Sequence, residues 1–358
     1  MKKSLIALAV LAASGGAMAQ SSVTLYGVAD AAVTYVNGLD NWTGLNSGAN
    51  KTSRLGFRGV EDLGGGLKAN FVIEGGFNLD NGDGASGYAG AKAGEGFQFK
   101  RQSTVGLAGN FGEVRLGREL TAAFNATARY DVFGSVGLAQ SRLWADGGVV
   151  DSNANAAAVT TNQRISNAVT YVSPDFSGFK VGLNYGFGEV AGGNTKSGYM
   201  GAGLMYDNGP LSLGLGLERL KSGANSVATG DVDAWSLGGS YDLGVAKLLA
   251  GYRESKVDLA AGENKRLGYY LAATAPVGPG LVRASYNRYE NKLNGGKDKA
   301  DQFGLGYVYS LSKRTSVYGT YAYIKNKDNG STFKLSNDVG VKTNGAQQGF
   351  QVGVSHAF

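Results

Sequence analysis

The chain lacks several residue types that common catalytic and metal sites require. Its 358 residues include no cysteine, one histidine (His356) and four prolines. The missing cysteine excludes disulfide bonds, thiolate metal sites and a cysteine nucleophile, and one histidine leaves little room for a Ser-His catalytic pair. The 59 glycines follow no G-X-Y repeat and accompany little proline, which excludes collagen and a Pro/Gly-rich disordered chain. Few classes of enzyme remain compatible with this composition.

Long hydrophobic runs are also missing after the first residues. Residues 1–19 contain two lysines, a short apolar stretch and a final Ala-x-Ala, the layout of a secretory signal peptide. We therefore expect 1–19 to be a signal peptide and 20–358 to be the exported protein, with 32 basic and 28 acidic side chains. No later window approaches 18 consecutive apolar residues. The exported chain is therefore either soluble outside the cytoplasm or spans a membrane as a β-barrel.

Alternation of apolar with small or polar residues runs through the whole exported chain. It is clearest in residues 179–187, 211–218, 267–273, 303–311 and 350–358. A period of two predicts β-strands with one apolar face. The other face carries Gly, Ser, Asn and Thr as well as charges, and the runs last about 9–11 residues, which suits tilted membrane-spanning strands. Small residues on the inner face also suit a sheet that curves into a barrel.

Short and long connections alternate between these strands. The short ones, rich in turn residues, are 61–66, 109–112, 173–178, 207–210, 242–244, 276–280 and 311–314. The long polar ones are 38–51, 80–96, 120–163, 188–198, 221–231, 255–265, 290–300 and 325–347. Fifteen connections predict an all-β fold, a 16-stranded antiparallel transmembrane β-barrel with both termini on the periplasmic side.

Several motifs resemble those of one protein family. They are SVTLYG at 22–27, SRLGFRG at 53–59, EDLG at 61–64, FKRQS at 99–103, GEVRLGR at 112–118, LSKRT at 311–315 and SHAF at 355–358. Together they resemble the general diffusion porins of Gram-negative β-proteobacteria, of the neisserial and comamonad type and closest to the anion-selective members. The resemblance covers essentially the whole exported chain. It implies a multi-pass outer-membrane channel, a homotrimer, and a third external loop folded inward to narrow the pore.

The resemblance and the residues together define the expected partners. Phe358 ends an alternating strand and resembles the C-terminal aromatic signal read by the barrel assembly machinery. Lipid and lipopolysaccharide of the outer membrane, small anions and hydrophilic solutes are the other expected partners. No cofactor is implied. Nucleic-acid binding is not expected, because the basic residues are spread along the strands and do not form one cluster.

Parity along the strands predicts which charged side chains face the lumen. Leu55 and Phe57 share the apolar parity, so Arg54 and Arg58 are expected to point inward. A lipid-facing arginine at the bilayer midplane costs roughly 2–4 kcal/mol, which favours the same assignment. Further along, we expect Ile165 to face lipid with Val169 and Tyr171, which leaves Arg164, Ser166 and Thr170 inside.

Three arginines cluster at the constriction of similar anion-selective porins, and the matching positions here are Arg54, Arg101 and Arg164. Arg101 shares its parity with the lipid-facing Val105. It would need a bulge between 101 and 105, or a position above the lipid band, to face the lumen. Lys100 is the inward neighbour by parity and shares the expected role.

The longest connection, 120–163, is the candidate constriction loop. Its acids are Asp131, Asp146 and Asp151, and Arg129 and Arg142 offset two of them. One net lumen charge about 8 Å away is worth roughly 2 kcal/mol before screening, and a tenfold partition needs about 1.4 kcal/mol. Two or three unpaired arginines would therefore give an anion preference, whereas pairing with acids such as Glu74 would leave them structural. The predicted filter is Arg54, Arg101, Arg164, Lys100, Arg58 and Arg142, with Glu74.

Two other functions remain open at this point. An outer-membrane barrel hydrolase would need a base near the lumen, but His356 shares the outward parity of Val354 and Phe358. A carboxylate pair could act instead, since 28 acids are present, yet no feature singles out such a pair. An adhesin or receptor would use the external loops and is compatible with a pore. We expect passive diffusion of small hydrophilic solutes with a preference for anions, and no enzyme activity.

Overall fold

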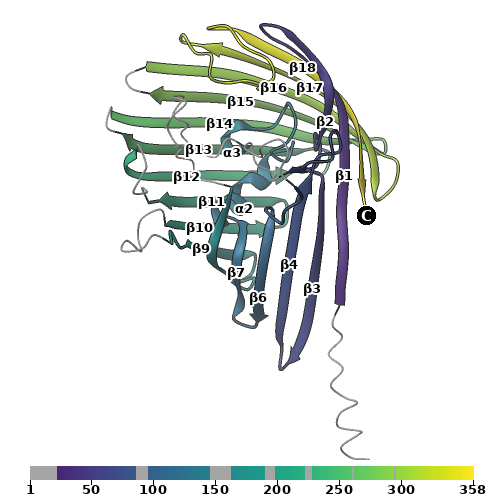
Figure 1. Ribbon diagram of the computed structural model, residues 1–358, viewed down its shortest axis with the longest axis vertical. Helices are drawn as coiled ribbons and strands as arrows, with labels where there is room; N and C mark the ends of the chain where they lie inside the picture. The colour runs from purple at the N-terminus through teal and green to yellow at the C-terminus, as the bar shows by residue number, and fades with distance from the viewer. Residues whose placement is uncertain are drawn as a thin grey trace, which may run out of the picture.

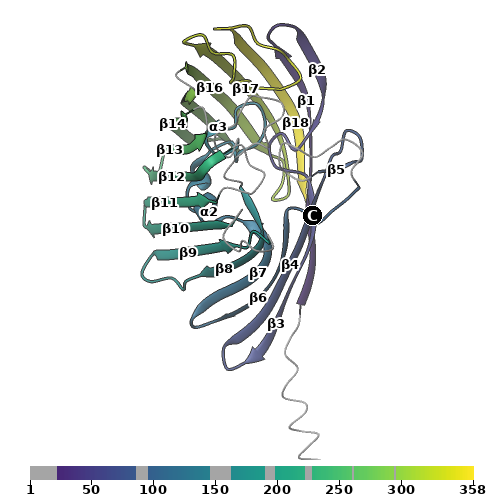
Figure 2. The ribbon, with the colours of Figure 1, turned by 60° about the vertical axis from the view of Figure 1, so that its left-hand side comes forward.

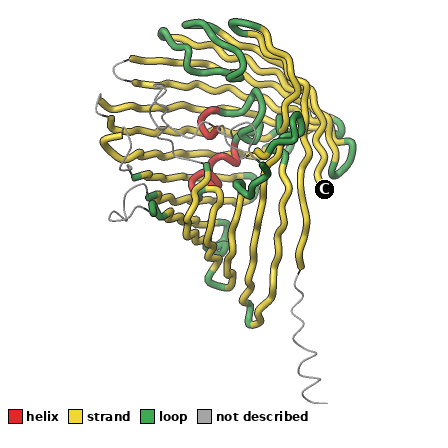
Figure 3. The backbone as a smooth tube through the Cα atoms, viewed as in Figure 1, coloured by secondary structure: helices red, strands yellow, loops and turns green. Residues whose placement is uncertain are grey.

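The computed structural model describes residues 22–85, 96–145, 163–189, 198–221, 228–259, 262–293 and 296–358. The expected signal peptide, residues 1–19, lies outside the described residues. The described residues form one large antiparallel sheet that curves around a few short helical turns (Figure 1, Figure 3).

The strands have these bounds: β1 Ser22–Asn37, β2 Asn41–Ser47, β3 Arg54–Gly64, β4 Leu67–Phe77, β5 Gly84–Ala85, β6 Gln102–Gly109, β7 Gly112–Leu120, β8 Arg164–Val172, β9 Phe179–Gly186, β10 Tyr199–Asn208, β11 Leu211–Leu220, β12 Ala228–Asp242, β13 Lys247–Leu259, β14 Gly262–Val277, β15 Gly280–Leu293, β16 Gly296–Ser310, β17 Thr315–Lys327 and β18 Ala346–Ala357. The helical turns are α2 (Ala122–Thr127), η1 (Ala128–Tyr130) and α3 (Arg142–Ala145). Within the described ranges, no helix has the length and apolar character needed to cross a membrane.

The sheet closes on itself through its first and last strands. β1 pairs with β18 on one side and with β2 and β3 on the other. The C-terminal half of β1 pairs with β2 and its N-terminal half pairs with β3. β2 and β3 therefore form a single barrel strand that is interrupted at 48–53. The two-residue β5 only pairs with the end of β4. The described residues therefore form a closed barrel of sixteen strands, as predicted (Figure 2).

The seven short connections lie where they were predicted, but two long ones are much shorter than expected. Residues 255–265 and 290–300 were expected to be loops, yet the β13–β14 ladder continues to Leu259↔Gly262 and the β15–β16 ladder to Leu293↔Gly296. The strands of this half are 13–16 residues long. Polar residues predominate in these extensions, so hydrophobic periodicity did not reveal them, although the backbone ladders continue through them.

The barrel is apolar outside and polar inside, the reverse of a soluble sandwich. Along β18, Phe350 and Val352 are 53% and 67% exposed on the outer face, while Gln351 between them is 4% exposed on the inner face. Outward apolar side chains are suited to lipid, whereas amides and hydroxyls inside can be hydrogen-bonded to one another or to water. The alternation seen in the sequence therefore separates lipid-facing from lumen-facing residues.

Glycines on the inner wall allow the chain inside the barrel to approach the strands closely. A Cβ at Gly203 would collide with the carbonyl oxygen of Ala122, and one at Gly214 with that of Ala126. A Cβ at Gly238 would collide with a ring carbon of Tyr130. Only glycine permits this backbone-to-wall contact, which explains part of the glycine excess.

Candidate pore lining and constriction

Residues 121–145, here called the inner segment, run along the inside of the barrel wall. α2 contacts β9, β10, β11 and β12, η1 contacts β12 and β13, and α3 contacts β14. Tyr130, Phe133, Leu143 and Trp144 are buried with wall residues such as Tyr270 in one apolar cluster. Figures 1 and 2 show α2 and α3 within the curve of the sheet. The inner segment therefore occupies lumen space on the side of β9–β18.

Polar wall residues fix the backbone of the inner segment. The Val132 N–H donates to the Tyr270 hydroxyl over 2.7 Å, and the Leu138 N–H donates to Gln351 Oε1 over 2.9 Å. At its start, the Thr121 hydroxyl accepts from the Phe124 N–H and caps α2. These bonds satisfy backbone groups that the irregular segment would otherwise bury unpaired.

Asp131, the one acid of the inner segment within the described ranges, is turned into the segment itself. Its carboxylate accepts from the N–H groups of Phe133, Ser135 and Ser141 over 2.9–3.0 Å, and the residue is 5% exposed. Burial raises the pKa of Asp131 above its usual range, and the hydrogen bonds partly oppose that shift. Its charge therefore shapes the turn and is not presented to the lumen.

Glu74 on β4 gathers two of the predicted arginines and a tyrosine. Arg101 Nε lies 2.6 Å from Glu74 Oε1, and Arg54 Nε lies 3.5 Å from Oε2. The Tyr26 hydroxyl donates to Oε2 over 3.0 Å. Arg164 Nε donates to the carbonyl oxygen of Arg101 over 2.8 Å. We call Tyr26, Arg54, Glu74, Arg101 and Arg164 the Glu74 cluster: two guanidinium groups lie at one carboxylate, and the third, that of Arg164, is bonded to the backbone of Arg101.

Arg101 points toward Glu74 although its sequence parity is that of lipid-facing residues. β6 begins at Gln102, so Arg101 precedes the regular ladder and alternation does not constrain its side chain. Its own N–H donates to the Glu74 carbonyl oxygen over 3.1 Å, which holds it beside β4. No bulge between 101 and 105 is needed. Lys100 is half-buried, and its carbonyl oxygen accepts from Arg118 Nε.

Arg58 and Arg142 lie apart from direct contact with Glu74. The Arg58 guanidinium carbon lies 5.3 Å from the centre of the Tyr26 ring, on the same wall. Arg142 instead donates to the carbonyl oxygens of Lys334 and Leu335 and so ties the inner segment to the connection after β17. Sequence alone grouped Arg142 with the others, and the structure places it elsewhere in the lumen.

The prediction for Ile165 and Ser166 was wrong. Ile165 is buried with Ala168 and Tyr199 on the inner side, while Ser166 is exposed and accepts from Arg118 Nη1. A bulge between β7 and β8 shifts the register after Gly117. Ser166 and Asn167 of β8 lie opposite a single residue of β7, and this extra residue moves Ile165 to the inner face. Arg164, the first residue of β8, is nevertheless buried, with its Nε bonded to the carbonyl oxygen of Arg101.

A charged group on β7 was missed at the sequence level. Arg115 lies 2.7 Å from carboxylate oxygens of both Glu113 and Glu119, and Asn70 also donates to Glu113. The sequence contained a signal for this group. Glu113, Arg115 and Glu119 have the parity opposite to that of Val114 and Leu116, which face outward. One arginine between two glutamates makes this part of the wall locally acidic, in contrast to the Glu74 cluster.

Comparisons with known proteins agree with this geometry. The family model described as "Gram-negative porin" matches residues 5–329. The outer membrane porin protein 32 of Delftia acidovorans is 45% identical, with both chains covered completely. An outer membrane porin protein of Bordetella pertussis is 34% identical over 91% of this chain and 95% of its own length. Among solved structures, the anion-selective porin from Comamonas acidovorans matches with a TM-score of 0.82 and 41% identity, covering 95% of this chain and 100% of that one.

These relatives are channels and not enzymes, and the closed barrel has the outward apolar surface of an outer-membrane protein. The hydrolase alternative therefore has no support in the family. The fold, the polar lumen and the inner segment together make a water-filled passage for passive diffusion across the Gram-negative outer membrane. The chain belongs to the Gram-negative porin family.

Proposed function

We propose that this porin prefers anions and that the Glu74 cluster is its selectivity filter. The observation that carries the proposal is the imbalance of charge in that cluster, where Arg54 and Arg101 share the carboxylate of Glu74 and the Arg164 guanidinium is bonded to the carbonyl oxygen of Arg101. The resemblance to a porin described as anion-selective supports the same direction. Charged rings of this kind select ions in pores by their sign.

The expected size of the effect follows from Coulomb's law. At an effective dielectric constant near 20, a unit charge about 8 Å away contributes roughly 2 kcal/mol before salt screening. A tenfold preference needs about 1.4 kcal/mol. The cluster carries two positive charges in excess of its carboxylate, so a clear preference survives considerable screening.

The proposed constriction lies between the inner segment and the wall that carries the Glu74 cluster. The inner segment packs against β9–β18, whereas the cluster belongs to β1, β3, β4, the start of β6 and β8. Solutes would therefore pass beside the wall that carries the Glu74 cluster. Asp131 adds little opposing charge there because its carboxylate is bound within its own turn.

We also propose assembly as a homotrimer through the outer face near the chain ends. On β1 and β18, Val33, Val352 and Val354 are at least 50% exposed without outward charges between them. An apolar groove of about 420 Å³ continues this face around Gly319 and Tyr321. Such a surface suits packing against another barrel as well as lipid.

Export and insertion complete the proposal. Residues 1–19 would direct secretion and be removed. The terminal Phe358 would be read by the barrel assembly machinery. Phe358 is 41% exposed at the end of β18, with its N–H bonded to the carbonyl oxygen of Gly27.

Single-channel recording in a salt gradient tests the filter. The wild-type channel is expected to show a reversal potential of the sign for anion preference, and Arg54→Gln with Arg164→Gln is expected to reduce it strongly. The matched control replaces Lys313 and Arg314, two exposed cations of a short connection, by glutamine. A wild-type preference for cations, or equal loss in the control, would overturn the proposal.

A further inference from the structure

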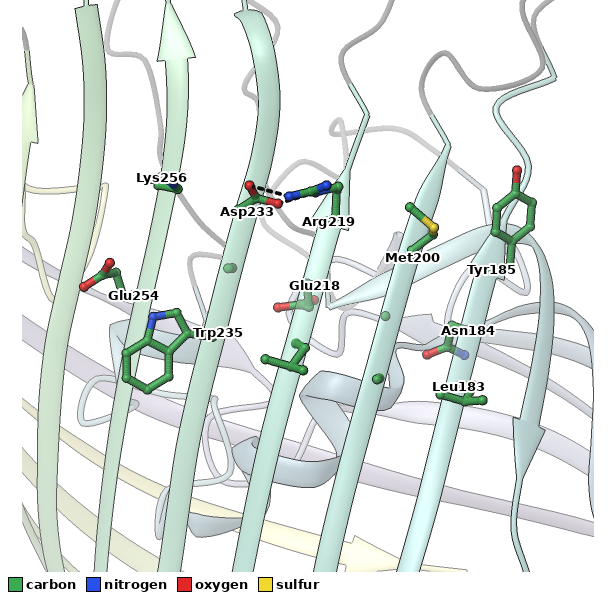
Figure 4. Close-up of a pocket in the computed structure, with 14 residues that line it drawn as sticks. Leu183, Asn184, Tyr185, Met200, Glu218, Arg219, Asp233, Trp235, Glu254 and Lys256 are labelled. Atoms are coloured by element: carbon green, nitrogen blue, oxygen red, sulfur yellow. Dashed lines mark hydrogen bonds and ion pairs between the residues drawn. The ribbon is translucent and has the colours of Figure 1, made fainter.

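The start of the inner segment is fixed by an inward residue of the wall. The Ala122 N–H donates to Oδ1 of Asn184 on β9, and Asn184 Nδ2 donates to the Thr170 hydroxyl over 2.6 Å. Leu183 and Tyr185, the neighbours of Asn184 along the strand, line a groove on the outer surface instead (Figure 4). Of these three residues, Asn184 therefore faces the lumen and holds the segment where α2 begins.

Around Gly137 the inner segment rests on a different support, the interruption at 48–53, here called the β2–β3 turn. A Cβ at Gly137 would collide with the Ala49 carbonyl oxygen, and Gly137 has a φ of +72°. Both the close approach and the left-handed backbone require glycine there. Arg54 follows the turn directly and begins β3. The β2–β3 turn therefore contacts the inner segment and also leads into the strand that carries Arg54 of the Glu74 cluster.

Asp30 on β1 holds the β2–β3 turn with both its side chain and its backbone. Its Oδ1 accepts from the Asn50 N–H over 3.2 Å, and its Oδ2 accepts from the Lys51 N–H over 3.1 Å. Its carbonyl oxygen accepts from the Gly48 N–H over 2.7 Å and from the Ser53 hydroxyl over 3.0 Å. Its own N–H donates to the same hydroxyl over 3.1 Å. Both ends and the middle of the turn are therefore bonded to one residue of β1.

Tyr318 on β17 orients the Asp30 carboxylate from the other side. Its hydroxyl donates to Asp30 Oδ1 over 2.7 Å, although β18 lies between β17 and β1. The hydroxyl can pass over β18 because Gly353 stands there, and a Cβ at that position would lie 2.5 Å from the hydroxyl oxygen. The Tyr318 ring also packs with Ala49 of the turn. Asp30 is fully buried, and its carboxylate is satisfied by two backbone donors and one hydroxyl.

We propose that Asp30 is a positioning residue for the constriction: through the β2–β3 turn, it fixes the separation between the inner segment and the wall that carries Arg54. This inference rests on the constriction described under the proposed function. Asp30 acts through the turn and touches no solute. The contact between Ala49 and Gly137 is already as close as glycine allows, so a loosened turn moves away from the inner segment. Loss of a hydrogen bond at Asp30 therefore widens the pore.

Exclusion of neutral polyethylene glycols from the open channel tests this role. In single-channel recordings, the smallest polymer that leaves the conductance unchanged gives the pore width. Asp30→Asn places an amide donor against one of the two backbone N–H groups of the turn. Tyr318→Phe removes one donor to Asp30 and changes no charge. Both variants are expected to raise the conductance and to shift the exclusion limit to larger polymers.

The matched controls remove equivalent groups from short connections. Asp242 accepts from the Gly244 N–H over 2.8 Å, and the Tyr307 hydroxyl donates to the Val277 carbonyl oxygen over 2.9 Å. Asp242→Asn and Tyr307→Phe are expected to keep the wild-type exclusion limit.

Gly137→Ala tests the same contact from the inner segment. Its Cβ would collide with the Ala49 carbonyl oxygen, so the exclusion limit should again shift to larger polymers. Gly134→Ala is its matched control. Gly134 has a φ of +66°, and among the described residues no atom lies within 4 Å of the added Cβ. The two substitutions share the cost of a left-handed alanine, so only the collision distinguishes them.

An unchanged exclusion limit in Asp30→Asn and Tyr318→Phe, or an equal shift in their controls, would overturn the positioning role. A changed reversal potential in Asp30→Asn with unchanged polymer exclusion would show a purely electrostatic role and would overturn it as well. Failure of the selectivity filter gives a different result, a wild-type preference for cations, and leaves the predicted exclusion of neutral polymers intact. A circular dichroism spectrum of intact β-sheet is required of each variant, and Tyr318→Phe keeps the test decisive if Asp30→Asn does not fold.

Discussion

Arg101, the residue just before β6, binds Glu74 through both its side chain and its backbone. Its Nε lies 2.6 Å from Glu74 Oε1, and its N–H donates to the Glu74 carbonyl oxygen. The same glutamate also accepts from Tyr26 and lies within 3.5 Å of Arg54. Arg101 is 7% exposed, so this carboxylate both orients a buried guanidinium and partly neutralises the wall of the lumen. The proposed selectivity and the stability of the cluster therefore both involve the side chain of Glu74.

Glu74→Gln separates these two roles. Removing the single carboxylate of the cluster is expected to increase anion preference, since one lumen charge contributes up to about 2 kcal/mol before screening. It also leaves Arg101 buried without its ion-pair partner, which costs about 3–5 kcal/mol in comparable pairs. Reversal potentials and thermal unfolding measure the two effects.

Glu113→Gln is the control for this variant, because Arg115 retains its pair with Glu119. A smaller loss of stability is expected there. If Glu74→Gln shifted selectivity toward cations, the assigned role of the cluster would be wrong.

Arg115→Gln is expected to move selectivity in the opposite direction. Arg115 neutralises both Glu113 and Glu119 at 2.7 Å, so its removal leaves two lumen carboxylates unpaired. The anion preference should fall, by more than it falls when Arg58, which lies over the Tyr26 ring, is replaced by glutamine. Bi-ionic potentials compare the two variants, and an unchanged potential for Arg115→Gln would contradict the prediction.

The stability of the folded protein should depend on pH through Asp131 of the inner segment. Burial raises the pKa of this carboxyl in the folded protein, so its contribution to stability is complete below the unfolded value near 3.9 and is lost as pH rises through the raised pKa. The wild-type unfolding temperature should therefore fall relative to that of Asp131→Asn as pH increases. Asp175, exposed in a short connection, supplies the control substitution. If the difference in unfolding temperature between the wild type and Asp131→Asn did not change with pH, Asp131 would not be the source of the pH dependence.

Gly203→Ala should displace the inner segment, because the new Cβ would collide with the Ala122 carbonyl oxygen. Overpacking of this kind typically costs about 1–3 kcal/mol, and the conductance should change as the segment moves. Gly319→Ala is the matched control on the outer face, where the nearest atom lies 4.0 Å from the added Cβ. Equal conductance in the two variants would show that the close contact does not position the segment.

Most of the barrel could be predicted because its determinants are local. The period of two, the turn residues of the seven short connections and the regular alternation of connection lengths all lie within short stretches of chain. Predictions that relied on uninterrupted parity failed at Ile165, where one bulge exchanged the faces. They also failed in the polar extensions around Leu259 and Leu293, where no apolar pattern marks the strand.

By itself, the sequence determined the number of strands, their inside-out polarity and the family motifs, since strand periodicity and turn formation depend on near neighbours. The tertiary structure decided the arrangement of the lumen. Arg54, Glu74, Arg101 and Arg164 are far apart in the chain, and only barrel register brings them together. Arg101 could turn toward Glu74 because it lies outside the ladder, where side-chain direction is set by contacts and no longer by alternation.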